Sequence, residues 1–525
     1  MSRSHQASTG SRLVTVSHYP VAASVGRLFP AYRAAQPVPR GENLQDMARR
    51  AFGRRGPAMS LVVAMAGAAL GSMALTGAPV VAAPGDHPVD QPVVQPVPRP
   101  NVVIVLTDDQ RRESMTYMPA VQRLLVDQGT RFTQAMVPTS LCCPSRATIL
   151  TGLYAHSTKV FGNGDVGGPR YGGWRRFHRA GMEDRTVAVA LHDVGYRTAL
   201  VGKYLNYFGR YTSPGYVPPG WDTFSTTLSS HGSYYRYRLN DGTYHGTAPE
   251  DYSTDVFAAK ATEFIRSTPV EQPLFLFFAP FGPHAPYVPA PRHDGALKGA
   301  LPAYTAPTMY QKVSTMPRWM RKRRHFTQAE VDLTRRKQQE TLLSVDEAVQ
   351  GIHDALQETG RERDTLFLFM SDNGYFWGEH RVIGKDAPYE DSTNIPMVVR
   401  WDGHVAAGTT DDRIVLNVDV ARTVAAATGA SMSTEGLDMF GSERRRGFVL
   451  EAMKGYNDRP AYCGWRTKNR MFVRWDGGER ELFDYRLDPA ERRNLAEKPR
   501  WAGVGRSMRA KAFAACRPRL PNFNW

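Results

Sequence analysis

Residues 101–109 read Asn-Val-Val-Ile-Val-Leu-Thr-Asp-Asp, and this short stretch sets the expected fold. Its β-branched apolar run predicts a strand buried on both faces, which is typical of a parallel sheet covered by helices. Residues 365–374 repeat the arrangement, with Thr-Leu-Phe-Leu-Phe-Met followed by Ser-Asp-Asn-Gly. Ligands of open parallel α/β sheets bind beyond the carboxyl ends of the strands. We therefore expect both acidic clusters to meet at one site.

Further apolar runs extend this pattern along the chain. Strand-like segments alternate with helix-compatible stretches, of which Glu340 to Leu356 is the clearest, and these further strands are expected at 197–202, 274–279 and 395–401. Such alternation predicts an α/β fold with a large, mainly parallel sheet sandwiched by helices. The tail differs, because Arg470–Trp475 and Arg480–Tyr485 flank a Gly-Gly pair and predict an antiparallel hairpin. A small C-terminal antiparallel-sheet subdomain is therefore expected.

The chemistry is carried by residues 142–152, which read Cys-Cys-Pro-Ser-Arg-Ala-Thr-Ile-Leu-Thr-Gly. Six of these positions match the pattern C-x-P-S-R-x-x-x-x-T-G, which is the signature of the sulfatases, and the strand-delivered carboxylates give this motif a fitting context. The alternative is that Cys142 and Cys143 are ordinary buried thiols, because free cysteine is among the most buried residue types.

Together with the acidic clusters, the motif makes the chain, over about residues 98–525, resemble the sulfatases of the alkaline-phosphatase superfamily. Within that family it is most similar to the N-acetylglucosamine-6-sulfatase group. The stretches that carry the likeness are Leu-Thr-Asp-Asp-Gln (106–110), Leu-Cys-Cys-Pro-Ser-Arg (141–146), Gly-Lys-Tyr-Leu-Asn (202–206), Thr-Leu-Leu-Ser-Val-Asp (341–346) and Ser-Asp-Asn-Gly-Tyr (371–375).

The resemblance implies that a formylglycine-generating enzyme oxidises Cys142 to formylglycine, whose hydrated aldehyde is the sulfatase nucleophile. It also implies a bound Ca²⁺, with Mg²⁺ as the alternative, and the implied ligands are Asp108, Asp109, Cys142, Asp372 and Asn373. Hard oxygen donors of this kind suit either ion better than zinc. The implied residues around the nucleophile and the sulfate are Arg146, which would hold the hydrate, and Lys203, His284 and Lys385.

Sulfate ester chemistry needs the same residue types. Cations are required at the nonbridging oxygens, and the departing alkoxide needs a proton. His284 follows the apolar run 274–279 and is the expected proton donor. The chain departs from many sulfatases at Leu205, where those enzymes have a histidine two positions after the motif lysine. The glucosamine-6-sulfatase group shares this change, which leaves the base for sulfate release unassigned.

Three functions remain open at this level. The first is a sulfuric ester hydrolase acting on a sulfated carbohydrate, such as N-acetylglucosamine 6-sulfate, or on an aryl sulfate. The second is a phosphodiesterase or phosphonate hydrolase of the same superfamily, which uses the same nucleophile and metal ligands. The third is a noncatalytic binder of sulfated glycans, which would be favoured if Cys142 stayed a thiol.

The N-terminal region predicts export. The apolar run Met59 to Leu75 follows Arg49-Arg50-Ala-Phe and Arg54-Arg55 and precedes Val-Ala-Ala at 81–83. This order is typical of a bacterial export signal, and Arg-Arg-x-Phe resembles a twin-arginine signal. We expect an exported protein, secreted or associated with the cell envelope, that meets the membrane only during export. A retained membrane anchor is the alternative.

These observations divide the chain as follows: a disordered segment or misassigned start at 1–46, the export signal at 47–83, a Pro-rich spacer at 84–100, the catalytic domain at 101–450 and the C-terminal subdomain at 451–525. Cys463 and Cys516 either form a disulfide or remain two buried thiols.

The net charge is +16, of which residues 1–57 contribute +7. The remaining excess suits an acidic substrate and does not specify nucleic acid. Arg321-Lys-Arg-Arg324, with Arg318 and Trp319, is either a solvated loop or a site for a sulfated polymer.

Overall fold

The computed structural model describes residues 99–164, 172–229, 232–312, 314, 316–455, 458–518, 520–521 and 523–525. The expectations for segments 1–46 and 47–83, and for all but the last two residues of the spacer 84–100, lie outside these ranges. Among the described residues, no helix combines the length and apolarity that a membrane crossing requires.

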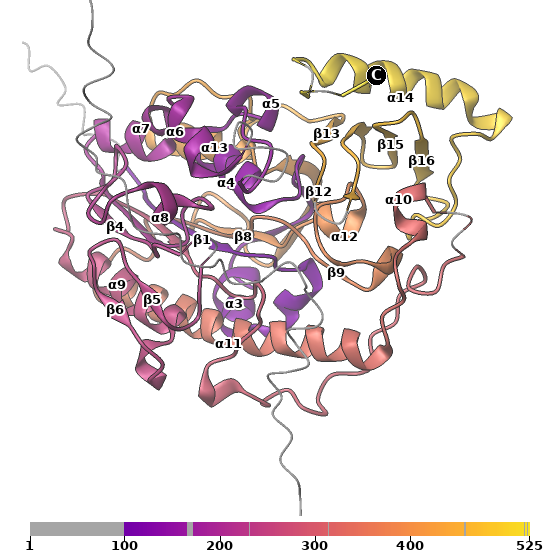
Figure 1. Ribbon diagram of the computed structural model, residues 1–525. Helices are drawn as coiled ribbons and strands as arrows, with labels where there is room; N and C mark the ends of the chain where they lie inside the picture. Colours follow the sequence, from indigo (N-terminus) through magenta and orange to yellow (C-terminus); the bar gives the residue numbers. More distant parts are fainter. Residues whose placement is uncertain are drawn as a thin grey trace, which may run out of the picture. The chain divides into compact units, whose positions relative to one another are not determined.

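An eight-stranded sheet forms the centre of the described fold (Figure 1). Its strands follow the order β12-β2-β11-β8-β1-β7-β3-β4, and all neighbours are parallel except the pairs that β11 makes with β2 and β8. The expected mainly parallel sheet is thus confirmed. The strand bounds are β1 (Asn101–Thr107), β2 (Thr130–Met136), β3 (Arg197–Gly202), β4 (Thr223–Ser225), β7 (Leu274–Ala279), β8 (Thr365–Ser371), β11 (Met397–Arg400) and β12 (Thr409–Leu416).

Helices cover both faces of this sheet, because successive strand residues point to opposite sides. Val102 and Ile104 of β1 pack with α4, α7 and α13, whereas Val103 and Val105 pack with α9 and α11. Figure 1 shows these two helical layers on either side of the strands. The bounds are α4 (Cys142–Thr151), α7 (Val187–Asp193), α13 (Asp419–Thr428), α9 (Ser253–Ser267) and α11 (Gln328–Glu358).

Helix α11 contains the predicted helical stretch 340–356 and begins twelve residues earlier, at Gln328. A capping box starts it, since the Thr327 side chain accepts from the Glu330 N–H while the Glu330 carboxylate accepts from the Thr327 N–H. The added turns are polar, so the apolar periodicity of the sequence underestimates the length of this helix.

A second sheet of four antiparallel strands confirms the small C-terminal subdomain, and it includes the predicted hairpin as β15 and β16. One face packs on α14, and Cys463 of β14 forms a disulfide with Cys516, which follows α14, with 6.4 Å between the Cα atoms. The other face packs against loops of the catalytic domain. The bounds are β13 (Phe448–Ala452), β14 (Tyr462–Arg466), β15 (Arg470–Trp475), β16 (Arg480–Asp484) and α14 (Ala502–Ala515).

Glu481 of β16 is buried where this second sheet meets the catalytic domain. Its carboxylate accepts hydrogen bonds of 2.8 Å from Trp475 Nε1 and from Tyr389 Oη. Burial raises the pKa of Glu481 from 4.5 to about 7 despite these two bonds. The folded protein therefore holds a proton on this group at pH values where the unfolded chain has already lost it.

Glu481→Gln is expected to stabilise the protein above pH 7, because the amide keeps an acceptor for both donors and never ionises. In the wild type, the free energy of unfolding should fall as pH rises from about 4.5 to about 7, and the variant should lack this loss, with a gain of about 1–3 kcal/mol at pH 8. Urea unfolding of both proteins across pH 4–8 measures the free energy of unfolding at each pH. Equal pH dependence in both proteins would contradict the assignment.

Candidate active site

Four neighbouring strands of the large sheet end at one edge, and polar residues follow each of them. In the sheet order β8, β1, β7 and β3, these residues are Asp372 with Asn373, Asp108 with Asp109, His284, and Lys203. Thr107 of β1 lies opposite Ser371 of β8, so the two acidic clusters start side by side. The Asp109 N–H donates to Asp372 Oδ1 at 3.2 Å. Sheet topology therefore gathers residues that are far apart in the sequence.

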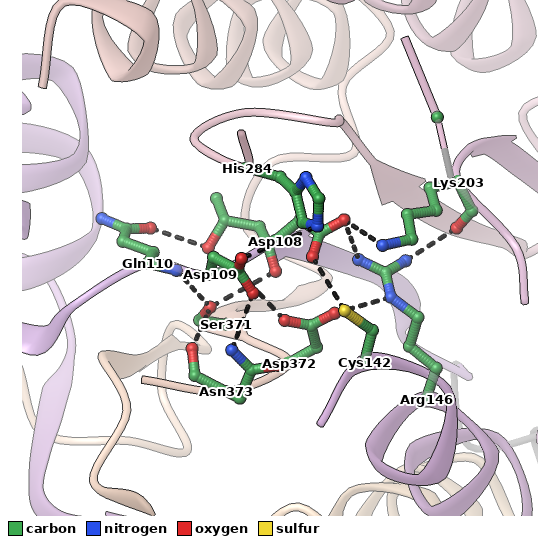
Figure 2. A network of polar contacts seen from close by, with 12 residues as sticks. Asp108, Asp109, Gln110, Cys142, Arg146, Lys203, His284, Ser371, Asp372 and Asn373 are labelled. Atoms are coloured by element: carbon green, nitrogen blue, oxygen red, sulfur yellow. Dashed lines mark hydrogen bonds and ion pairs between the residues drawn. The ribbon is translucent and has the colours of Figure 1, made fainter. Parts of the chain in front are cut away.

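Helix α4 brings the cysteine motif to the same edge (Figure 2). Every residue of this helix is buried, and Sγ of Cys142, at its first position, lies 3.5 Å from Asp108 Oδ1. Arg146 follows one turn later on the same helix face. Its Nε donates to Asp372 Oδ2 and its Nη1 to the Lys203 carbonyl, both at 2.7 Å. Its Nη2 makes no hydrogen bond to any described residue.

Two lysines, the buried Lys203 and the partly buried Lys385, complete the ring of cations. Lys203 Nζ forms an ion pair with Asp108, and Lys385 Nζ forms one with Asp109 and lies 2.7 Å from Cys142 Sγ. Gly202 allows Lys203 to reach this position, because its φ is +118° and an added Cβ would lie 2.0 Å from the Ala279 carbonyl oxygen. The end of β3 therefore lies closer to β7 than it could if position 202 carried a residue with a side chain.

His284 lies over the carboxylates with one ring nitrogen already engaged. Its Nδ1 is 2.7 Å from the Ala285 carbonyl oxygen and donates to it, which leaves Nε2 facing Asp109 Oδ2 at 3.7 Å. Tyr234 Oη donates to the His284 carbonyl at 2.7 Å and fixes the loop. Burial lowers the pKa of His284, and the charges of Asp108 and Asp109 oppose that effect.

The site balances three carboxylates against three permanent cations: Asp108, Asp109 and Asp372 against Arg146, Lys203 and Lys385. Burial alone would raise the pKa of Asp108, but Lys203, His284 and Arg146 hold it well below its usual range. Burial and the Asp108 charge raise the pKa of Asp372 to about 6. Burial, reinforced by Asp108, raises the pKa of Cys142 to about 12, so the unmodified side chain is a neutral thiol at pH 7.

The donor set fits a metal ion. Ligand atoms of Asp108, Asp109, Cys142 and His284 all lie within 4.8 Å of one another. Asn373 Nδ2 donates to Asp109 Oδ1 at 2.8 Å, while Asn373 Oδ1 is buried without a hydrogen bond to any described residue. A buried carbonyl oxygen without a partner costs free energy, and a hard cation would satisfy it. The structure thus brings together all nine predicted site residues.

Three supporting residues were missed by the sequence analysis. Ser371 Oγ accepts from the Gln110 N–H at 2.9 Å and donates to the Asn373 carbonyl at 2.9 Å. Thr107 Oγ1 donates to Gln110 Oε1 at 2.7 Å. These bonds tie the two acidic loops together (Figure 2). Their positions directly beside the aspartates were the available signal, but neutral side chains of this kind are common in ordinary turns.

The chain belongs to the sulfatase family, whose model matches residues 100–430; a second model, N-sulphoglucosamine sulphohydrolase, C-terminal, matches residues 378–516. The human N-acetylglucosamine-6-sulfatase is 32% identical over 408 residues, which cover 74% of this chain and 69% of that protein. A Sulf-1 extracellular sulfatase homologue of Caenorhabditis elegans is 31% identical over 382 residues, or 68% of this chain, and the match spans only 51% of that relative's length. An extracellular sulfatase SULF-1 homologue of Drosophila melanogaster is 33% identical over 62% of this chain and is matched over 29% of its own length.

Solved structures share the fold at lower identity. A protein in complex with its substrate D-glucosamine-2-N,6-O-disulfate has a TM-score of 0.67 and 21% identity, covering 80% of this chain and 98% of that one. A phosphonate monoester hydrolase of Agrobacterium radiobacter has a TM-score of 0.62 and 19% identity, covering 80% and 96%. These likenesses show that the chain shares its fold with both proteins.

Asp108→Asn is expected to weaken divalent-cation binding by about two orders of magnitude, because the variant keeps the shape of the side chain but replaces a charged donor with a neutral one. The cation affinity is measured by titration with Ca²⁺ and Mg²⁺, with elemental analysis and the cation-dependent rise in Tm as readouts. Asp412→Asn, on an exposed carboxylate paired with Lys468, is the control. Unchanged cation affinity in Asp108→Asn would place the ion elsewhere.

Proposed function

We propose that the protein is a sulfuric ester hydrolase that removes sulfate from a 6-sulfated amino sugar or a related sulfated carbohydrate. The observation that carries the proposal is the position of Cys142: the motif cysteine lies within hydrogen-bonding distance of both Asp108 and Lys385, inside the ring of cations. The names of the N-acetylglucosamine-6-sulfatase relatives support the substrate class.

Cys142 would be converted to formylglycine, which supplies the nucleophile as its hydrated aldehyde. Ca²⁺ would be held by Asp108, Asp109, Asp372, Asn373 and the converted residue, and would neutralise charge near the sulfate. Arg146 Nη2, which makes no hydrogen bond to a described residue and lies 3.7 Å from Asp108 Oδ2, would then be available for an oxygen of the hydrate. With the carboxylates engaged by the ion, Lys203 and Lys385 would be released from their ion pairs and could bind the nonbridging sulfate oxygens.

His284 acts as the proton donor in this proposal. When the S–O bond to the sugar breaks, its electron pair stays on the sugar oxygen, which needs a proton to leave as an alcohol. The Nδ1 bond to the Ala285 carbonyl holds the ring with Nε2 directed at the site. Donation therefore requires the imidazolium form of His284, in which Nε2 also carries a proton and gives it to the sugar oxygen. A phosphate diester or phosphonate, with its similar shape and charge, is the competing substrate class.

We also propose that the chain is exported, with the signal at 47–83 and the domain boundaries as expected from the sequence. The Cys463–Cys516 disulfide supports an oxidising destination. The relatives named as extracellular sulfatases agree with it. A folded-state export route through a twin-arginine signal would allow Cys142 to be converted before transit.

Co-expression with a formylglycine-generating enzyme should yield a protein whose Cys142 peptide has the mass of the aldehyde, and which releases sulfate from glucosamine 6-sulfate and from aryl sulfates. Cys142→Ala should abolish turnover with the fold intact, whereas Cys143→Ala, the matched control, should be milder. Mass spectrometry and sulfate release measure both effects. Faster turnover of a phosphate diester than of every sulfate ester would assign the competing class, and an unconverted thiol in the native protein would favour a noncatalytic glycan binder.

His284→Ala should slow sugar sulfates far more than aryl sulfates, because a phenolate leaves with little protonation and a sugar alkoxide does not. Loss of a general acid commonly costs about 10²–10⁴ in rate. Values of kcat for glucosamine 6-sulfate and for 4-nitrophenyl sulfate give the comparison, and Tyr234→Phe controls for a shift of the loop. Equal losses for both substrates would show that His284 binds sulfate and is not the acid.

A further inference from the structure

A strongly basic segment lies beside the loop that carries Lys385. Residues 310–326 contain six arginines and lysines and no acidic residue. Within this segment, the short helix α10 (Arg318–Arg321) and the residues after it expose the side chains of Arg318, Arg321, Lys322 and Arg324. The only one that pairs with a described carboxylate is Arg324, which contacts Glu330 at 2.8 Å. The remaining charges are available to an anionic partner.

The segment is held in place by buried contacts. Met316 and Met320 are 2% and 0% exposed and pack with Phe376, Val382 and Ala387, which surround Lys385 in the sequence. Trp319 packs on the same core, with its ring 5.5 Å from that of Trp475. Figure 1 shows α10 beside β16 of the small sheet. The basic side chains are therefore anchored at a fixed distance from the active site.

Arg381 joins this segment from the catalytic domain. It lies in the turn between β9 (Phe376–Trp377) and β10 (Ile383–Gly384), two strands that pair directly before Lys385. His380 and Arg381 have φ values of +50° and +59°, an unfavourable backbone conformation for two consecutive residues with side chains. Arg381 Nη1 donates to the Arg323 carbonyl at 3.3 Å. The strained turn thus places the guanidinium of Arg381 against the basic segment.

Arg323 is the innermost cation of the segment. Its guanidinium lies 4.8 Å from the ring centroid of Trp319, and its Nε is buried without a hydrogen bond to any described residue. Burial lowers the pKa of Arg323, and Asp386 opposes that effect, which places the two side chains within electrostatic reach. Asp386, however, already pairs with Arg459 at 2.8 Å. No described carboxylate lies within ion-pair distance of Arg323 or Arg381.

We propose that Arg323 and Arg381, flanked by Arg321 and Lys322, form a second anion subsite for an anionic oligosaccharide. It would bind a sulfate or carboxylate on a sugar next to the one whose sulfate is removed, and it rests on the proposed function. Arg381 and Lys385 are four positions apart, so their Cα atoms are separated by at most about 13 Å along an extended chain, which is comparable with a disaccharide. Arginine suits a sulfate or a carboxylate because its planar guanidinium can donate two parallel hydrogen bonds to either group.

The test measures binding in a Cys142→Ala background, so it does not depend on turnover. Calorimetric titrations compare the parent with a double variant that carries Arg323→Gln and Arg381→Gln. Each protein is titrated with a heparin-derived tetrasaccharide and with glucosamine 6-sulfate. Tetrasaccharide affinity should fall about 10- to 100-fold, and affinity for the monosaccharide should stay within about twofold. Arg179→Gln combined with Arg266→Gln removes the same charge elsewhere and is the matched control. Arg323→Lys, which keeps the charge, should recover part of the affinity.

Three results would overturn the subsite: unchanged tetrasaccharide affinity, an equal loss in the control pair, or equally tight binding of a single-stranded DNA of matched charge. The Tm of the double variant is measured separately. If it falls, the tetrasaccharide affinity of the parent is compared with that of the conservative Arg323→Lys variant. Failure of the proposed function is a different outcome, in which aldehyde-containing wild type releases no sulfate from either ligand although both bind.

Discussion

The constraint on which the structure depends is the mutual neutralisation of three buried carboxylates by the buried Arg146 and Lys203 and the partly buried Lys385 at one edge of the sheet. Asp108 is fully buried and Arg146 is 1% exposed, so neither charge is stabilised by water. Removing a partner from such a group leaves an uncompensated buried charge, which is far more costly than the net value of the pair. The positions of β3, β8 and α4 are therefore linked through Arg146, which contacts Asp372 and the Lys203 carbonyl together.

In the proposed function, the same balance would let the site accept both a metal and an anion. A divalent cation would draw the carboxylates away from Lys203 and Lys385, and the positive charge so released matches an incoming sulfate. On binding, the ion pairs of the two lysines with the aspartates would then be exchanged for ion pairs with the anion. Preorganised charges of this kind need little rearrangement, which is why they are effective in water-excluded sites.

The small C-terminal sheet supports the loop that carries Lys385. Strands β9 and β10 have two residues each and would be marginal alone. Phe376 and Val382 of this hairpin region pack with Leu450 and Val473 of the second sheet. The Cys463–Cys516 disulfide fastens α14 to the opposite face of that sheet. The C-terminal residues therefore contribute to the site through packing, although the residues that contact the reacting groups come from the catalytic domain.

The sequence by itself determined the strands that are buried on both faces and the residue types of the site. Continuous apolar runs predicted β1, β3 and β7, whereas β2 and β12 were missed because their partly exposed, polar residues do not form such runs. The motifs identified the aspartates, Cys142 and Arg146. Only the tertiary structure decided that Lys203 pairs with Asp108, that Cys463 and Cys516 form a bridge, and that Arg381 lies against Arg323. These contacts depend on strand order and loop packing between residues far apart in the chain, which local patterns do not encode.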